Sequence, residues 1–167
     1  MQTTTRNTNA TQTRSRQRKI RNAEKVPLPR TSTHLNELLE WSAHPNPKSI
    51  KFVHRHYARD VFFKDPFREL YTTEDLQKYY QKTLERLNDV HFSFENVLEH
   101  GQQAFVTWVM TAHFMKREFS VHGTSHFKFN SSGLCEYHRD YFDLSEEIYE
   151  HLPVVGYVFK GLRRVLN

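Results

Sequence analysis

Three side chains have the types and positions needed for proton transfer. Asp65 precedes Pro66 at the end of a short apolar run, and His138 and Asp140 alternate along a later segment with strand periodicity. Carboxylates and imidazole are common general acids and bases, and a carboxylate can orient a neighbouring imidazole. Because residues i and i+2 of a strand share one face, His138 and Asp140 would project together. Both alternating sets of this segment hold aromatic and charged residues, so periodicity leaves its inward face open.

Helices are expected in the first part of the chain beyond residue 30. Apolar residues recur at helical spacing in a segment that begins near Ser32 or Thr33, either of which could cap it. The same spacing predicts two further helices, and a short apolar run between them predicts a strand. These elements cover Lys48 to about Ala58, the strand 61–65, and Glu74–Leu87 with Thr73 as its cap.

Strands are expected after His91. Period-two patterns cover about 91–100, 103–115, 118–130 and 134–143, with turns at 101–102 and 130–133. A last helix is expected from about Ser145 to Leu166. Helices followed by a strand meander are typical of an α+β fold, in which helices pack on one face of an antiparallel sheet.

Alternation on the predicted strands separates two faces of the sheet. One face is largely apolar and includes Trp108 and Met110 on one strand, and Ser125 and Phe127 on the next. The opposite face is polar and is expected to contact solvent or a second subunit. A homodimer through this outer sheet face would use the row His122, Thr124, His126, Tyr137, Arg139 and Tyr141.

The net charge of +5 is concentrated in a basic N-terminal tail. Residues 1–30 hold eight Arg and Lys and one Glu, so of the totals of 24 basic and 19 acidic residues the remainder holds 16 and 18. All 23 aromatic residues lie beyond residue 30. We therefore expect a disordered tail over 1–30 joined to one domain over 31–167. Nucleic-acid binding is not favoured, because no aromatic residue interleaves with the basic ones to stack on bases.

Composition also argues against several classes of protein. No apolar run is long enough to span a membrane, and no apolar leader opens the chain. Cys135 is the only cysteine, which excludes an intramolecular disulfide and fits a cytoplasmic protein. The eleven histidines do not predict a metal site, because His54 and His56 point apart on the predicted helix. His122 and His126 are too far apart on their strand to chelate easily.

Residues 57–66, YARDVFFKDP, resemble the first-strand signature of SnoaL-like and ketosteroid-isomerase-like domains of the nuclear transport factor 2-like superfamily. Residues 125–130 followed by Gly133, the strand with Trp108 and the closing segment 137–143 are similar to the same family, over roughly residues 33–150. The resemblance implies a cone in which helices close over a strongly curved sheet around a deep pocket. Family members include isomerases, polyketide cyclases, dehydratases, epoxide hydrolases and pure binding modules, so the fold alone assigns no reaction.

The resemblance assigns roles residue by residue. Asp65 matches the position of the isomerase general base, and burial in an apolar pocket would raise its pKa. Ser125 matches the position of a protonated acid, and Trp41 that of a tyrosine, both of which donate to an oxyanion in the isomerase. Serine and tryptophan can donate hydrogen bonds but cannot act as those acids. Steroid-isomerase chemistry is therefore not carried over.

The resemblance also turns the last strand so that His138 and Asp140 face the pocket. The predicted catalytic residues are then Asp65, His138 and Asp140. The predicted ligand-binding residues are Trp41, Tyr57, Phe63, Trp108, Met110, Ser125, Phe127 and Phe142. We expect a pocket for a small apolar molecule and acid–base chemistry without a cofactor, of the isomerase, cyclase or dehydratase type, on an apolar carbonyl or polyketide-like compound. The alternative is a non-catalytic ligand-binding or protein-interaction module of the same fold.

The candidate residues also have purely structural explanations. Asp65 before a proline could cap a turn by accepting hydrogen bonds from backbone N–H groups. His138 and Asp140 could form a structural pair. Trp108 and Met110 could belong to the hydrophobic core.

Overall fold

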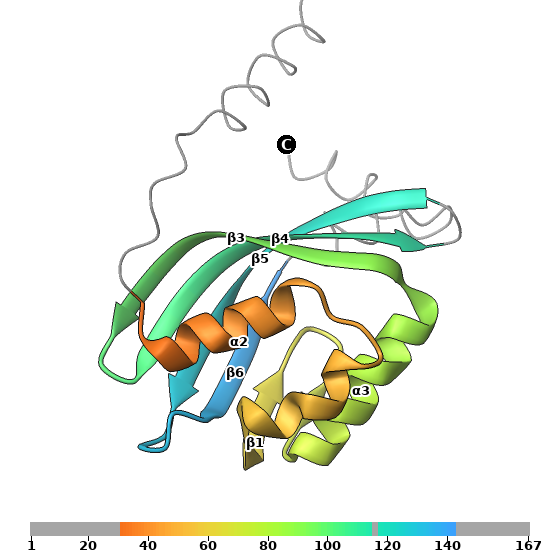
Figure 1. Ribbon diagram of the computed structural model, residues 1–167. Helices are drawn as coiled ribbons and strands as arrows, with labels where there is room; N and C mark the ends of the chain where they lie inside the picture. Colours follow the sequence, from red (N-terminus) through yellow and green to blue (C-terminus); the bar gives the residue numbers. More distant parts are fainter. Residues whose placement is uncertain (1–30, 115–116, 143–167) are drawn as a thin grey trace, which may run out of the picture.

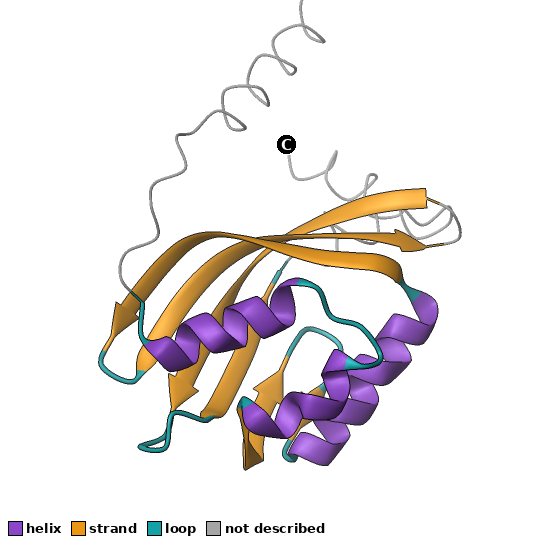
Figure 2. Cartoon of the chain, in the orientation of Figure 1, coloured by secondary structure: helices purple, strands orange, loops and turns teal. Residues whose placement is uncertain are grey.

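The computed structural model describes residues 31–114 and 117–142. Its helices are α2 (Thr33–Ala43), the 3-10 helix η1 (Ser49–Arg55) and α3 (Thr73–Arg86). No helix within these residues is long and apolar enough to cross a membrane. α2 and α3 lie along the concave side of a curved sheet (Figure 1, Figure 2). The tail expected over 1–30 and the helix expected from about residue 145 lie outside the described residues.

The sheet has six strands in the order β2-β1-β6-β5-β4-β3. β3 to β6 form the expected antiparallel meander, whereas β6 pairs in parallel with β1. The α+β prediction is therefore confirmed, with a mixed sheet. The strands are β1 (Tyr57–Lys64), β2 (Glu69–Leu70), β3 (Asn88–His100), β4 (Gln103–Phe114), β5 (Arg117–Phe129) and β6 (Cys135–Tyr141).

The parallel pairing of β1 with β6 places two candidate acids at the same end of two neighbouring strands. Lys64, the last residue of β1, pairs with Arg139, two residues before β6 ends. Asp65 and Asp140 directly follow this pair. The preceding pair in this register joins Phe63 to His138. Residues far apart in the sequence thus meet because both strands run in the same direction.

The prediction of a helix from Lys48 to about Ala58 is wrong. The helix is the shorter η1, and Tyr57 already begins β1. The side chain of Asn46 accepts hydrogen bonds at 3.0 Å from two backbone N–H groups of the following turn, which starts a tight helical segment. At its other end the backbone of Cys135 donates to the His56 carbonyl at 2.8 Å, and this bond draws the chain into the sheet. The two-residue β2 was not predicted, because period two needs a longer run to be recognised.

Side chains at the helix ends fix α3 against the sheet. Thr72, and not the predicted Thr73, caps α3 by accepting a hydrogen bond at 3.1 Å from a backbone N–H group of the first turn. Thr73 donates instead to the carbonyls of Ala58 and Arg59 on β1, at 3.1 and 3.0 Å. Fixed in this way, α3 presents its own aromatic residues to the inner side of β1. The predicted cap Ser32 is confirmed at the start of α2.

Candidate functional site

Asp65 forms the turn between β1 and β2. Its Oδ1 accepts hydrogen bonds at 2.7 Å from the backbone N–H groups of Phe67 and Arg68, and Pro66 presets the backbone of this turn. Its Oδ2 accepts a hydrogen bond at 2.5 Å from the hydroxyl of Tyr79 on α3. Asp65 is 7 % exposed, so this buried carboxyl group has partners on both oxygens. Asp65 therefore caps its turn through backbone N–H groups, which is the structural role expected for an aspartate before a proline.

The electrostatics of the Asp65–Tyr79 pair follow from this burial. Desolvation raises the pKa of Asp65, whereas the hydrogen bonds from Tyr79 and the two backbone N–H groups lower it. The charge of Asp140 adds to the rise in the pKa of Asp65. Desolvation and the hydrogen bond to Asp65 raise the pKa of Tyr79 far above its ordinary value, so the proton between them stays on the phenol.

His138 lies between a carboxylate and a phenol. Its Nε2 is 2.8 Å from Asp140 Oδ1, and its Nδ1 is 2.9 Å from the Tyr57 hydroxyl. Because an ionised carboxylate only accepts hydrogen bonds, the proton of a neutral His138 is assigned to Nε2, and Nδ1 accepts from Tyr57. The imidazole is buried and packs against Phe63 and Phe127, with ring centroids 5.0 and 4.5 Å away. β6 therefore turns its candidate residues to the inner side of the sheet.

A second group of donors reaches Asp140 from β4 and β5. Trp108 Nε1 donates to the Ser125 hydroxyl at 2.8 Å, and Ser125 donates to Asp140 Oδ1 at 2.5 Å. Trp108 lies opposite Gly123 in the strand register, and a Cβ atom at Gly123 would come within 2.4 Å of the indole. Glycine at this position therefore provides the space in which the indole reaches Ser125.

The predicted cluster of three catalytic residues divides into two bonded groups. His138 is bonded to Asp140 and Tyr57, whereas Asp65 is bonded to Tyr79 and to its own turn. The two carboxylates interact through their charges, because Asp140 raises the pKa of Asp65. The directly bonded pair able to share a proton is His138–Asp140. Within residues 31–114 and 117–142, no three His, Cys, Asp or Glu side chains are grouped as metal ligands would be.

Both carboxylates line one cavity of about 460 Å³, a size that suits a small organic molecule. Two of its lining side chains, Tyr141 and Phe142, are aromatic. The Phe142 ring in turn lies 6.0 Å from both Phe67 and Trp108, measured between centroids. The cavity therefore combines two acids and two cations with aromatic side chains. Its lining residues are Lys64, Asp65, Pro66, Arg139, Asp140, Tyr141 and Phe142.

Of the predicted ligand-binding residues, only Phe142 is among those that line this cavity, and the others lie elsewhere in the described part of the chain. Trp41 stacks on His56, and its indole N–H donates to the Ser49 carbonyl at 3.0 Å, so this donor is already used. Met110 is half-buried on β4. Buried around the imidazole of the site are Tyr57, Phe63 and Phe127.

Sequence reasoning missed Tyr79 and Tyr80 as site residues and placed them only in the apolar stripe of their helix. Tyr79 bonds Asp65, and burial together with the neighbouring Tyr80 raises the pKa of Tyr57. The signal was available in the spacing, because both tyrosines follow Leu76 by three and four residues and share its inward face. A buried tyrosine hydroxyl needs a polar partner, which points toward a polar site.

Comparison with known proteins agrees with this architecture. A family model described as the SnoaL-like domain matches residues 39–138, which is more than half of the chain. The chain belongs to the SnoaL-like family. No curated protein matches it.

Solved structures share the fold of this SnoaL-like domain at low sequence identity. An NTF2-like protein of unknown function from Burkholderia pseudomallei K96243 has a TM-score of 0.61 and 14% identity, covering 70% of this chain and 95% of that one. A protein with a ketosteroid isomerase-like fold from Catenulispora acidiphila, in complex with trimethylamine, has a TM-score of 0.60 and 16% identity, covering 71% and 91%. An LEH-like epoxide hydrolase from M. tuberculosis has a TM-score of 0.58 and 14% identity, covering 80% and 89%. These likenesses support the fold and no particular reaction.

Proposed function

We propose that this SnoaL-like domain binds a small apolar molecule in its cavity and transfers protons with His138 and Asp140. It would act without a cofactor, as an isomerase, cyclase or dehydratase on an apolar carbonyl or polyketide-like compound. The observation that carries the proposal is the 2.8 Å hydrogen bond between these two residues, of which Asp140 lines the cavity together with Phe142. A histidine–carboxylate pair supplies both an acid and a base near neutral pH.

The hydrogen bonds favour Asp140 over Asp65 as the base. Asp65 accepts three hydrogen bonds that occupy both of its oxygens. Asp140 accepts from Ser125 and His138 on Oδ1, which fixes the carboxylate while Oδ2 is left for a ligand in the cavity that Asp140 lines. The proposal therefore moves the predicted base from β1 to β6.

Elimination from nitrobenzisoxazole tests the proposal, because this apolar probe needs only a base. Removal of its ring C–H proton breaks the N–O bond and releases a coloured cyanophenolate. We expect the wild-type protein to exceed an equal concentration of acetate, and Asp140→Asn to lose about 100-fold or more of that rate. Asp65→Asn should lose less than about tenfold. A wild-type rate no greater than that of acetate, or a larger loss with Asp65→Asn, would contradict the assignment.

One observation favours the second candidate, a non-catalytic binding module. The Trp41 and Ser125 donors, which the resemblance matches to the oxyanion donors of the isomerase, are bonded within the protein. A module of this kind would bind the probe and leave it unchanged. Saturable binding measured by calorimetry, without elimination, would select this candidate over the enzyme.

A further inference from the structure

The proposed proton transfer leaves negative charge on the ligand. When Asp140 takes a proton from the carbon beside a carbonyl group, the electron pair of the broken C–H bond forms a C=C bond, and the carbonyl oxygen becomes an enolate oxygen. A fixed charge or hydrogen-bond donor beside the oxygen on which charge develops stabilises such a transition state most. A group of this kind must contact the ligand in the cavity that Asp140 lines.

Several donors of the inner face are directed at other protein groups. The Trp108 N–H group donates to Ser125, and the Ser125 hydroxyl donates to Asp140. The Tyr80 hydroxyl is hydrogen-bonded to Tyr57. None of these donors is among the residues that line the cavity. The group that stabilises an enolate is therefore sought among the lining residues themselves.

The cavity lies where the pairing of β1 with β6 ends. The last pair joins Lys64 to Arg139, and β1 then ends in the turn of Asp65, whereas β6 continues to Tyr141. Residues on both sides of this last pair line the cavity, namely 64–66 and 139–142. Successive side chains of a strand point to opposite faces, so a cavity beside the end of β1 is lined from both faces of β6. Arg139 and Asp140 therefore share it, although they are neighbours in the sequence.

The two cations of the cavity differ in their partners. Lys64 Nζ lies 2.5 Å from a carboxylate oxygen of Glu69. Among the described residues no carboxylate forms an ion pair with Arg139, whose half-buried guanidinium lies 4.8 Å from the centroid of the Tyr141 ring. Hydrogen bonds from Lys64 and Tyr71 lower the pKa of Glu69 most, and the charge of Arg139 adds least. The charge of Arg139 is thus the less neutralised of the two.

The chemistry of a guanidinium group suits an oxyanion. It stays protonated in proteins, and its planar fork of N–H donors can bind one or two oxygens of an anion. Asp140 itself repels an anion while it is ionised. This repulsion disappears as Asp140 takes the proton, so the enolate oxygen forms beside Arg139 and a neutral carboxyl group.

We infer that Arg139 is a further catalytic residue of the cavity, which binds the carbonyl oxygen of the ligand and stabilises its negative charge while Asp140 removes the proton. The inference rests on the proposed function, since it assigns the partner of the same base. It orients the ligand with its oxygen toward Arg139 and its acidic C–H toward Oδ2 of Asp140. It narrows the substrate class to ketones and esters that can form an enolate.

Binding of p-nitrophenol tests the charge of Arg139 without turnover. The ionised oxygen of this probe resembles that of an enolate, the probe ionises near neutral pH, and its phenolate is yellow. In absorbance titrations of the full chain, the pH at which half of the bound probe is ionised should be at least about one unit higher in Arg139→Gln than in the wild type. Arg59→Gln, which removes the same charge from an exposed site near the start of β1, should leave this pH unchanged.

A conservative variant separates the charge of Arg139 from its packing on Tyr141. Arg139→Lys keeps the charge and loses the planar contact with the ring, so the bound probe should ionise within about half a pH unit of the wild-type value. In the elimination of nitrobenzisoxazole, which also forms a phenolate oxygen, Arg139→Gln should lower kcat about tenfold or more and change KM less than about threefold.

The outcomes separate this inference from the proposed function. An unchanged ionisation of the probe in a folded Arg139→Gln protein, or equal shifts in the Gln and Lys variants, would overturn the role of Arg139 and leave the base and the cavity standing. Near-UV circular dichroism checks folding. A wild-type elimination rate no greater than that of acetate would overturn the proposed function. Failure of p-nitrophenol to bind the wild type up to its solubility would overturn both.

Discussion

Burial and hydrogen bonding shift the pKa of the Asp65 carboxyl group in opposite directions. Desolvation is the larger effect and raises the pKa, whereas the three donors lower it. The folded protein therefore holds this proton at a pH at which the unfolded chain has released it, near the ordinary value of about 3.9. Stability contributed by Asp65 is then present at low pH and is lost as the pH rises through the raised pKa.

Asp65→Asn tests the direction in which Asp65 makes stability change with pH. An amide keeps an oxygen for the two turn N–H groups and carries no charge, so it removes the loss of stability at higher pH. Relative to the wild type, the free energy of unfolding of the variant should increase as the pH rises from about 3 through the window just above 3.9. Urea unfolding of both proteins at a series of pH values measures it. If the free energy of unfolding of the variant instead falls relative to the wild type as the pH rises, the hydrogen bonds lower the pKa of Asp65 more than burial raises it.

At the scale of elements, the contact between β4 and β5 depends on the absence of a side chain at Gly123. A Cβ atom there would lie 2.4 Å from two ring carbons of Trp108. Gly123→Ala should therefore displace the indole and lower the free energy of unfolding by about 1–3 kcal/mol, the usual cost of overpacking. The displaced indole of Trp108 would also lose its hydrogen bond to Ser125.

A double-mutant cycle checks the cause. In a Trp108→Leu background the ring is gone, so Gly123→Ala should cost close to nothing, and urea unfolding should show a coupling of about 1–3 kcal/mol. If Gly123→Ala lowered the free energy of unfolding equally in both backgrounds, its cause would be the backbone of β5 and not the contact with Trp108.

The same elements show what the sequence could predict. The strand meander and α3 were predictable because their apolar periods are long, and Asp65 was visible beside its proline. The inward facing of His138 was not, because both alternating sets on β6 mix aromatic and charged residues. It depends on the parallel pairing with β1, a contact between distant segments. The bonding of Asp65 was also hidden, because its donors include a hydroxyl from α3, which the sequence places only in a hydrophobic stripe.

At the scale of the whole molecule, an aromatic row crosses the outer face of the sheet. Phe62 stacks on Tyr137, Tyr137 contacts His126, and His126 stacks on Phe105, with centroids 5.3, 5.2 and 4.1 Å apart. The row continues to Leu98, which pairs with Phe105 and is 75% exposed. It spans β1, β6, β5, β4 and β3 and contains two residues predicted for a dimer face. Phe105 and Leu98 are exposed, and the other three residues of the row are half-buried. A partly exposed apolar surface of this kind is typical of a protein contact.

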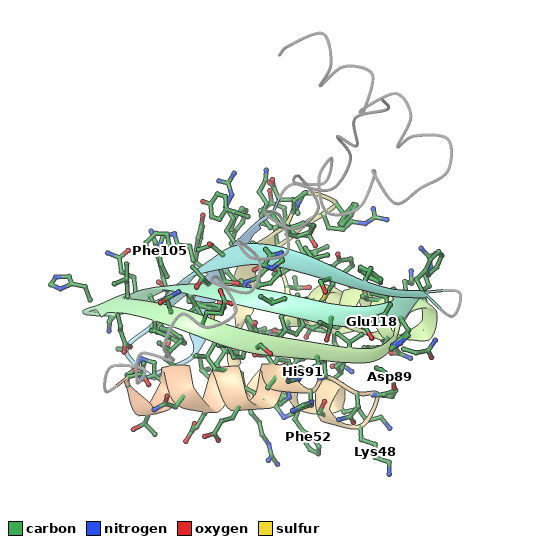
Figure 3. The ribbon with its side chains drawn as sticks, turned by 90° about the horizontal axis from the view of Figure 1, so that it is seen from above. Lys48, Phe52, Asp89, His91, Phe105 and Glu118 are labelled. Atoms are coloured by element: carbon green, nitrogen blue, oxygen red, sulfur yellow. The ribbon has the colours of Figure 1, made fainter. Side chains whose placement is uncertain are left out.

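We therefore propose a homodimer in which two outer faces pack about a two-fold axis. Phe105→Glu would place a charge in the row, so light scattering should show the dimer dissociating toward the 20.1 kDa chain, with a dissociation constant raised about tenfold or more. Phe52→Glu is the matched control, because Phe52 and Phe105, both labelled in Figure 3, are each 43% exposed, yet Phe52 lies on η1. Since the two changes have the same chemistry and exposure, only position distinguishes them. A monomeric wild type, or equal disruption by both variants, would contradict the outer-face dimer.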